Sequence, residues 1–287
     1  MTAELPGGPS PPLMSDDLYR RFCALVHERT GLHFSEGSRF FLEKRLEARV
    51  AATGAEEMED YYTYLRFDPD RAAEWDQLIV AITTNETYFM REERQLRCLQ
   101  REILPALWAK SPGAKIRIWS AGCSSGEEAY TLAILLREQP VVPISAVEVQ
   151  ATDINTRVLG KAREGIYTPN SFRTTDGAFR DRWFTPAGPD RWRVKDELRS
   201  GITFSRFNLF ELERYALLAP FDVILCRNVI IYFDLDSKVK VVERFHDRIK
   251  PGGYLLLGHS ESLISVTDKF RLVHLATDLV YIKGADA

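Results

Sequence analysis

The sequence is poor in cysteine, with four residues among 287: Cys23, Cys98, Cys123 and Cys226. They are scattered, so they form neither the short paired spacing of a zinc knuckle nor the disulfide framework of a small secreted domain. The five histidines show no metal-ligand spacing either. We therefore expect reduced thiols and no metal site.

Long apolar runs and an excess of charge are also missing. The longest apolar stretches, FDVILC and YLLLG, have the length of strands and are far too short to span a membrane. The first residues, MTAELPGGPSPP, lack the charged-then-apolar order of a signal peptide. The formal net charge of -3 gives no overall attraction to nucleic acid or to an anionic membrane. We expect a soluble cytoplasmic protein that binds no nucleic acid and does not insert into a membrane.

Apolar residues make up 45% of the chain, enough to form one large and one smaller domain. Residues 1–14 are rich in proline and glycine and are predicted to be a disordered arm. Helical spacing of apolar residues, with Ser15 as a first cap, predicts a small all-helical domain over 15–82. Residues 83–114 are predicted to be a linker followed by a connecting helix.

From residue 115 onward, strand and helix patterns alternate, which predicts a mostly parallel sheet over 115–287. The alternation stops at about 168–200, where short aromatic-rich runs around the turn AGPD predict a small antiparallel β insertion rather than a helix. The last runs, FRLVHLA and LVYIKG, predict an antiparallel C-terminal hairpin. The expected fold class is therefore α/β and Rossmann-like, with a helical N-terminal domain.

The most informative segment is KIRIWSAGCSSG, residues 115–126, in which an apolar strand runs into a glycine-bearing turn and a helix start. Glycine lets the backbone approach a ligand, and the free N–H groups of the helix N-terminus face it. Asp153 ends the next strand, where it can accept hydrogen bonds from ribose hydroxyls. Too few strands follow Asp153 for the second half of a dinucleotide fold, which favours a mononucleoside-type cofactor.

Six ordered blocks carry a resemblance to a known family. They are TTNETYFMRE from Thr83, WSAGCSSGEEAY from Trp119, ATDI from Ala151, NL from Asn208, CRNVIIYF from Cys226 and GHSESL from Gly258. Together they resemble the CheR-type chemotaxis receptor methyltransferases, which are protein-glutamate O-methyltransferases. The match runs over about 18–282 and implies a class I S-adenosylmethionine-dependent methyltransferase.

The resemblance also implies roles for individual residues. Arg91 and Tyr232 would orient the acceptor carboxylate. The residues implied for the cofactor are Asn85, Thr87 and Arg91 on the linker side, Gly122 in the loop, Glu127 and Asp153 at the amino acid or ribose portions, Asn208 and Leu209 at the adenine, and Asn228 and Val229 at the methionine part.

Purely structural roles are open for several of these residues. Arg91 could pair with a neighbouring glutamate, and Tyr232 could pack behind its strand. In the same way, Asn85 or Thr87 could cap a helix, Glu127 could be a solvated first-turn acid, and Asn208 and Asn228 could stabilise turns.

The implied reaction is methylation of glutamate carboxylates on the cytoplasmic helices of chemoreceptors for sensory adaptation, with S-adenosylhomocysteine as the other product. The resemblance implies that basic residues of the second helix bind an acidic receptor helix, and Arg45 and Arg49, one turn apart there, are the residues expected to do so. An ordinary solvated face is also possible, because Glu43 and Glu47 neutralise much of it. Relatives that tether to a receptor's C-terminal pentapeptide resemble one another in a longer, glycine-richer loop, whereas TPAGPD is short with one glycine, so the resemblance implies no such tether.

Four other functions compete with this one. A methyltransferase acting on nitrogen would need an N-P-P-Y-like strand end, and the segment Arg227–Ile230 lacks those prolines. A cofactor-binding sensor or adaptor without catalysis remains open, as does another protein substrate. A nicotinamide oxidoreductase is disfavoured by the strand count.

Overall fold

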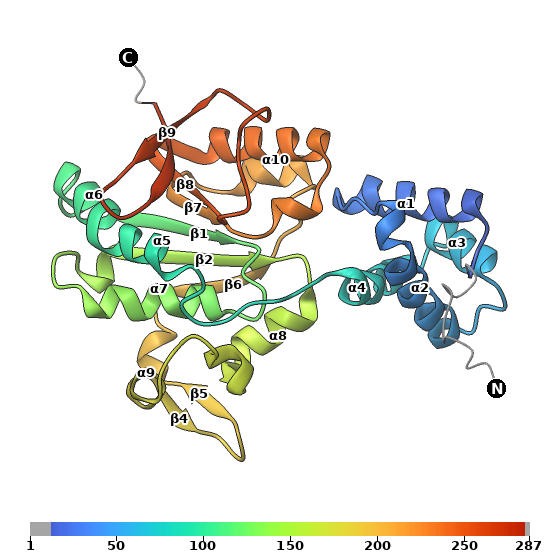
Figure 1. Cartoon of the computed structure of the whole chain (residues 1–287), viewed down its shortest axis with the longest axis horizontal. Helices are drawn as coiled ribbons and strands as arrows, with labels where there is room; N and C mark the ends of the chain where they lie inside the picture. Colours follow the sequence, from blue (N-terminus) through green and yellow to red (C-terminus); the bar gives the residue numbers. More distant parts are fainter. Residues whose placement is uncertain (1–12, 285–287) are drawn as a thin grey trace, which may run out of the picture. The chain divides into compact units, whose positions relative to one another are not determined.

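The computed structural model describes residues 13–284, and the chain divides after Thr83 into two compact units (Figure 1). Of the arm predicted over 1–14, residues 1–12 lie outside the described residues. The other two are held: the Leu13 amide donates to Glu43 Oε2 at 3.2 Å, and Met14 is buried in the helical core.

The first unit consists of helices, as the apolar spacing predicts. They are α1 (Asp16–Thr30), a 3-10 turn (Glu36–Ser38), α2 (Arg39–Thr53), α3 (Met58–Phe67) and α4 (Arg71–Ile82). Ser15 caps α1 by accepting from the Leu18 amide, and Gly31 ends it at a φ of 72°. The helices bury one shared core that includes Phe22, Leu42 and Trp75.

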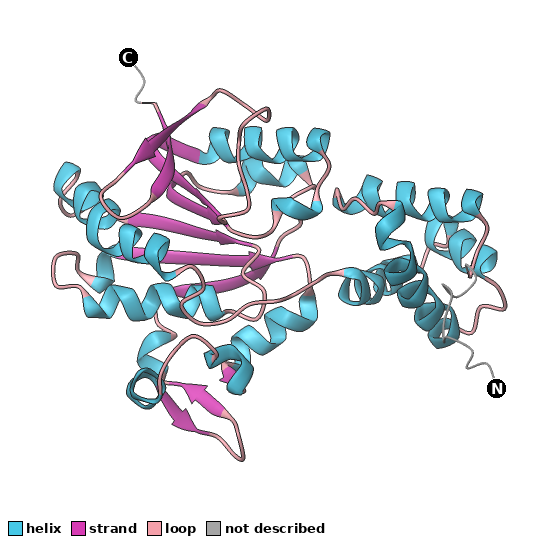
Figure 2. Cartoon of the chain, in the orientation of Figure 1, coloured by secondary structure: helices cyan, strands magenta, loops and turns pink. Residues whose placement is uncertain are grey.

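The second unit is built on a seven-stranded sheet with the order β6-β2-β1-β7-β8-β10-β9. Figure 2 shows its strands in magenta and the helices around them in cyan. The strands are β1 (Ile116–Ala121), β2 (Val147–Asp153), β6 (Ile202–Arg206), β7 (Phe221–Cys226), β8 (Ile249–Leu257), β9 (Phe270–His274) and β10 (Leu279–Lys283). The five strands from β6 to β8 are parallel, whereas β10 pairs antiparallel with both β8 and β9. The predicted fold class, including the C-terminal hairpin, is confirmed.

Helices cover both faces of this sheet, so its parallel strands are buried on both sides, as such sheets require. The main helices are α5 (Glu93–Cys98), a π-helical turn (Leu99–Ile103), α6 (Leu104–Lys110), α7 (Glu127–Glu138), α8 (Thr156–Glu164) and α10 (Leu235–Arg248). Ile118 packs with residues of α5 and α7 on one face. Its neighbour Trp119 points to the other face, where its ring lies 5.5 Å from that of Phe245 in α10.

Short 3-10 helices connect several of these elements. They span Ile144–Ala146, Pro169–Phe172, Asp196–Leu198, Leu212–Leu217 and Ile230–Tyr232. Among residues 13–284, no helix combines the length and the apolarity that a membrane crossing requires.

The insertion contains the predicted antiparallel sheet, formed by β3 (Ile166–Tyr167), β5 (Trp192–Val194) and β4 (Phe184–Pro186) in that order. The prediction of strands without a helix is wrong, because α9 (Gly177–Trp183) precedes β4. Asp176 starts this helix by accepting from the Phe179 amide at 2.7 Å. Aromatic packing around Phe89 stabilises the short helix, since Phe179 lies 6.2 Å from the Phe89 ring.

The strand order determines where a ligand can bind. From β1 the chain moves outward through β2 to β6 and then returns to form β7 on the other side of β1. Ligands of open α/β sheets bind at such a switch point, outside the carboxyl ends of the strands.

Candidate functional site

The glycine loop after β1 is folded tightly against its neighbours. Gly122 has a φ of 94°, and its amide donates to the Thr152 carbonyl at 2.8 Å. A Cβ on Gly122 would lie 2.4 Å from Val229 Cγ2, so only glycine fits at this position. The loop after β1 therefore touches the turn after β7, as the sequence blocks require.

Asp153 at the end of β2 reaches across to the same loop. Its Oδ2 accepts from the Ser124 amide at 2.9 Å, and its Oδ1 accepts from the Asn155 amide at 2.8 Å. Burial raises the pKa of Asp153, although these backbone donors act in the opposite direction. The carboxylate thus lies beside the backbone of the glycine loop.

Glu127, the first residue of α7, is 2% exposed, so the interpretation as a solvated first-turn acid is wrong. Its carboxylate accepts from the hydroxyl groups of Ser171 at 2.9 Å and Ser125 at 2.7 Å. Burial raises its pKa, while these hydrogen bonds oppose the shift. The side chain is held in the wall of the site.

The end of β6 adds Asn208 and Leu209, both of which are buried. The Phe207 amide donates to the Asp153 carbonyl at 3.1 Å, which places this end next to β2. Asn208 Oδ1 accepts from the Phe210 amide at 3.0 Å, the turn chemistry expected of asparagine. Its Nδ2 donates to Glu211 Oε1 at 3.4 Å, so the side chain is held in the turn that follows β6.

Residues 84–92 pass over the glycine loop. Ser124 Oγ donates to the Asn85 carbonyl at 3.3 Å, and the Thr87 side chain is half-buried. Arg91 donates to the Glu86 carbonyl at 2.7 Å. No carboxylate pairs with Arg91 among residues 13–284, so the interpretation of Arg91 as a partner of a neighbouring glutamate is wrong for the described residues.

The backbone on both sides of Arg91 is strained. Met90 has a φ of 60° and Glu92 a φ of 52°, in the left-handed region that costs residues other than glycine about 1–3 kcal/mol each. Such a conformation persists only where surrounding contacts determine it. Arg227 contacts Arg91 and Glu92, and the Met90 amide donates to Thr131 Oγ1 at 3.3 Å.

Arg227 forms a buried ion network at the end of β7. Its side chain is 2% exposed and donates to Glu92 Oε2 at 3.1 Å and to Glu128 Oε2 at 2.9 Å. It also donates to the Arg91 carbonyl at 2.5 Å. Burial acts to raise the pKa of Glu92, but the charge of Arg227 and donors that include Asn228 outweigh it, so the pKa is lowered. The network joins β7, α7 and the segment that carries Arg91.

The turn after β7 completes the edge. Asn228 has a φ of 58°, and its buried Oδ1 has no hydrogen-bond partner among the described residues. Tyr232 is 36% exposed, so the interpretation that it packs behind its strand is wrong. The structure therefore brings the ends of β1, β2, β6 and β7 to one place.

Sequence reasoning missed the charged residues that hold this edge together, namely Glu92, Glu128, Arg227 and Glu261. All four belong to the sequence blocks already singled out. The available signal was the repeated presence of ionisable residues beside apolar strand ends, where a charge is seldom buried without a partner.

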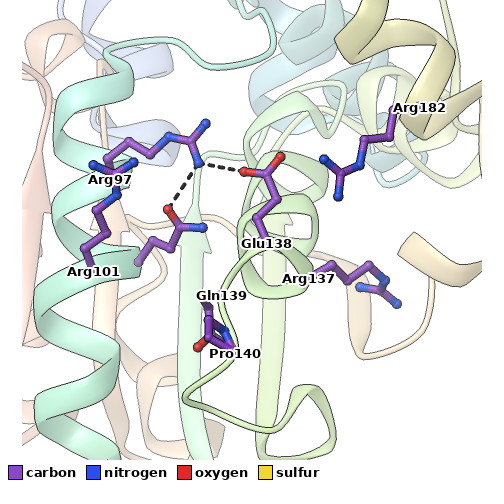
Figure 3. A pocket seen from close by; sticks show the side chains of 8 residues that line it. Arg97, Arg101, Arg137, Glu138, Gln139, Pro140 and Arg182 are labelled. Carbon is purple, nitrogen blue, oxygen red and sulfur yellow. Dashed lines mark hydrogen bonds and ion pairs between the residues drawn. The ribbon is translucent and has the colours of Figure 1, made fainter.

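A groove of about 610 Å³ lies at the opposite end of α7 (Figure 3). It is lined by Arg97, Gln100, Arg101, Arg137, Glu138, Gln139, Pro140 and Arg182. Arg97 pairs with Glu138 at 2.6 Å, but the other arginines leave the lining cationic. The groove therefore lies at the other end of α7 from the candidate site, and its lining is mainly cationic.

Comparison with known proteins gives matches over nearly the whole chain. The family model described as "CheR methyltransferase, SAM binding domain" matches residues 85–279, and "CheR methyltransferase, all-alpha domain" matches residues 17–83. "Chemotaxis protein methyltransferase 2" of Vibrio cholerae is 36% identical over 272 residues, covering 94% of each chain. "Chemotaxis protein methyltransferase" of Salmonella typhimurium is 35% identical over 283 residues, covering 95% of this chain and 96% of the relative.

Replacing Arg227 with alanine leaves Glu92 and Glu128 buried without a partner. We expect Arg227→Ala to lower the free energy of unfolding by about 3–5 kcal/mol, the usual cost of breaking a buried pair. Arg244→Ala is the control, since its pair with Asp247 is 44% and 48% exposed and is worth about 0.5 kcal/mol or less. Urea denaturation measures the free energy of unfolding of both variants. If both lost the same amount of stability, the ion network around Arg227 would not stabilise the protein as we expect.

Proposed function

The chain belongs to the CheR methyltransferase family, and on this premise we propose that it methylates glutamate carboxylates on the cytoplasmic helices of chemoreceptors. Its cofactor is S-adenosylmethionine. One observation carries the proposal: two contacts lie at the same edge of the sheet. Gly122 packs against Val229, and Asp153 accepts a hydrogen bond from the glycine loop. The protein would work in the cytoplasm, where those helices lie.

The residues at this edge fit an adenosyl ligand that carries an ammonium group. In our proposal Asp153 accepts from the ribose, Asn208 and Leu209 border the adenine, and Gly122 permits close backbone approach. The unpartnered buried Oδ1 of Asn228 is a suitable acceptor for a ligand N–H group. The other residues proposed for the cofactor are Asn85, Thr87, Arg91, Glu127 and Val229.

The bound cofactor supplies a methyl group on a positively charged sulfur. A glutamate acceptor has an ordinary pKa of about 4.3, so at neutral pH its carboxylate is already ionised and needs no general base. In the transfer a carboxylate oxygen of the acceptor would bond to the methyl carbon, the carbon–sulfur bond would break, and its electron pair would stay on sulfur. The products are a methyl ester and S-adenosylhomocysteine, and no proton is transferred.

Because the acceptor needs no activation, alignment is the main task of the protein. Holding two reactants in line can contribute about 7–11 kcal/mol to lowering the barrier. We propose that Arg91 and Tyr232 orient the acceptor carboxylate. The half-buried guanidinium of Arg91 has no carboxylate partner among the described residues, and the Tyr232 side chain is 36% exposed, so both can reach a substrate.

Recognition of the receptor is proposed to involve the first unit. Arg45 on α2 is exposed, with its guanidinium 5.1 Å from the Phe41 ring. Arg49 instead donates to both carboxylate oxygens of Glu74 at 2.8 and 2.6 Å, which balances its charge inside the unit. We therefore assign the contact with an acidic receptor helix mainly to Arg45 and propose no pentapeptide tether.

A methyl-transfer assay tests the proposal directly. The protein, S-adenosylmethionine with a labelled methyl group and a purified receptor cytoplasmic fragment are incubated together, and the product is then treated with base. We expect label in the receptor and its release as volatile methanol, because carboxyl methyl esters hydrolyse in base. Base-stable label would indicate methylation of nitrogen. Absence of label, despite cofactor binding, would indicate the disfavoured sensor or adaptor.

Asp153→Ala tests the proposed ribose contact. The variant should bind S-adenosylhomocysteine more weakly by more than about 1 kcal/mol in titration calorimetry, since a charge-assisted hydrogen bond is worth at least that. Asp268→Ala, which removes an exposed carboxylate, should leave the affinity unchanged. Unaltered affinity in a folded Asp153→Ala protein would remove this residue from the site.

Arg45→Glu tests the proposed receptor contact. A charge reversal should raise KM for the receptor fragment about tenfold, with kcat and S-adenosylhomocysteine affinity within about twofold, because a rim charge affects association rather than chemistry. The effect should shrink as salt is added. Arg20→Glu makes the same charge change on an exposed position of α1. If both variants behave alike, Arg45 has no specific role.

A further inference from the structure

One carboxylate holds the turn that follows β7. Glu261, in the segment after β8, accepts from the Asn228 and Gly258 amides with Oε2, each at 2.7 Å. Its Oε1 accepts from the Val229 amide at 2.9 Å and from the Ile231 amide at 3.2 Å. Four backbone donors from two loops thus share a single side chain.

This concentration of donors needs an anionic acceptor. Successive backbone N–H groups that point at one place form an anion-binding concavity, and a carboxylate has two oxygens with enough lone pairs for all four. Burial raises the pKa of Glu261, whereas the four N–H groups act to lower it. The side chain is therefore a structural ligand of the turn.

The turn after β7 and the segment after β8 are packed so closely that a side chain larger than that of glycine does not fit between them. A Cβ on Gly258 would lie 2.6 Å from Asn228 Nδ2, so only glycine allows this approach. Asn228 itself is left-handed, with a φ of 58°, a conformation that is uncommon outside glycine. Without Glu261, four converging donors would lose their acceptor and the turn could relax.

The position of this turn matters for both reactants. Val229 packs against Gly122 of the glycine loop. Asn228 Nδ2 donates to Glu92 Oε1 at 3.3 Å, and Tyr232 lies three residues after Val229. We propose that Glu261 is a positioning residue: its carboxylate holds the turn so that Asn228 and Val229 meet the cofactor and Tyr232 meets the acceptor. The reactant roles of these three residues rest on the proposed function.

Two substitutions distinguish an acceptor role from simple packing. Glu261→Gln preserves the size but turns an NH₂ group toward two backbone donors, so it loses at least two of the four hydrogen bonds. Glu261→Ala removes the side chain and lets water reach the donors. If packing were the main role, glutamine would be much better than alanine. If the role is to accept hydrogen bonds, glutamine is no better.

The experiment compares wild type, both variants and Glu243→Gln, a control that removes an exposed charge paired with Lys269. Calorimetry with S-adenosylhomocysteine, kcat and KM for the receptor fragment, and thermal unfolding are measured for each. We expect both Glu261 variants to fold, to bind S-adenosylhomocysteine at least tenfold more weakly and to lose at least tenfold in kcat. The control should match wild type.

Three results would overturn the proposal: cofactor affinity and kcat within twofold of wild type, a glutamine variant close to wild type with alanine strongly impaired, or loss of cooperative folding in both variants. The last would mean that Glu261 serves the stability of the whole unit. If wild type binds S-adenosylhomocysteine but does not methylate the receptor, the proposed function fails. The affinity comparison then still tests Glu261.

Discussion

The buried pairing of Arg227 with Glu92 and Glu128 is the interaction on which the rest of the candidate site depends. Removing three charges from water is costly, and only their mutual attraction and hydrogen bonds offset that cost. The pairs at 3.1 and 2.9 Å tie β7 to α7 and to the strained backbone around Arg91. A segment far away in sequence is thereby held over the sheet edge.

The same edge is built from close contacts that leave little freedom. Gly122 touches Val229, and Asp153 receives a hydrogen bond from the glycine loop. Methyl transfer to an ionised carboxylate needs alignment more than proton transfer. The acids at this edge fit this need: Glu92, Glu128 and Glu261 accept hydrogen bonds from the protein's own donors. None of these three carboxylates therefore acts as a base toward the acceptor.

Patterns confined to one element were predictable. The alternation of strands and helices, the helical first unit and the C-terminal hairpin follow from periodicities that each element carries alone. The helix α9 was missed because its seven residues have too weak a pattern, and packing against Phe89 stabilises it. The partner of Arg49 was also unpredictable, since Glu74 lies 25 residues away and meets it only after α2 and α4 pack.

Local patterns were enough to predict the architecture, because strand ends and glycine turns are properties of short stretches of chain. The candidate residues came mainly from ordered sequence blocks that resemble a known family. Which charges neutralise one another became visible only in the folded chain. Glu127 is buried, Arg49 is paired, and Glu261 gathers four amides from two loops. Charged groups interact with whatever lies near them in space, and the strength of that interaction depends on how deeply they are buried. The order of residues gives neither the partner nor the burial.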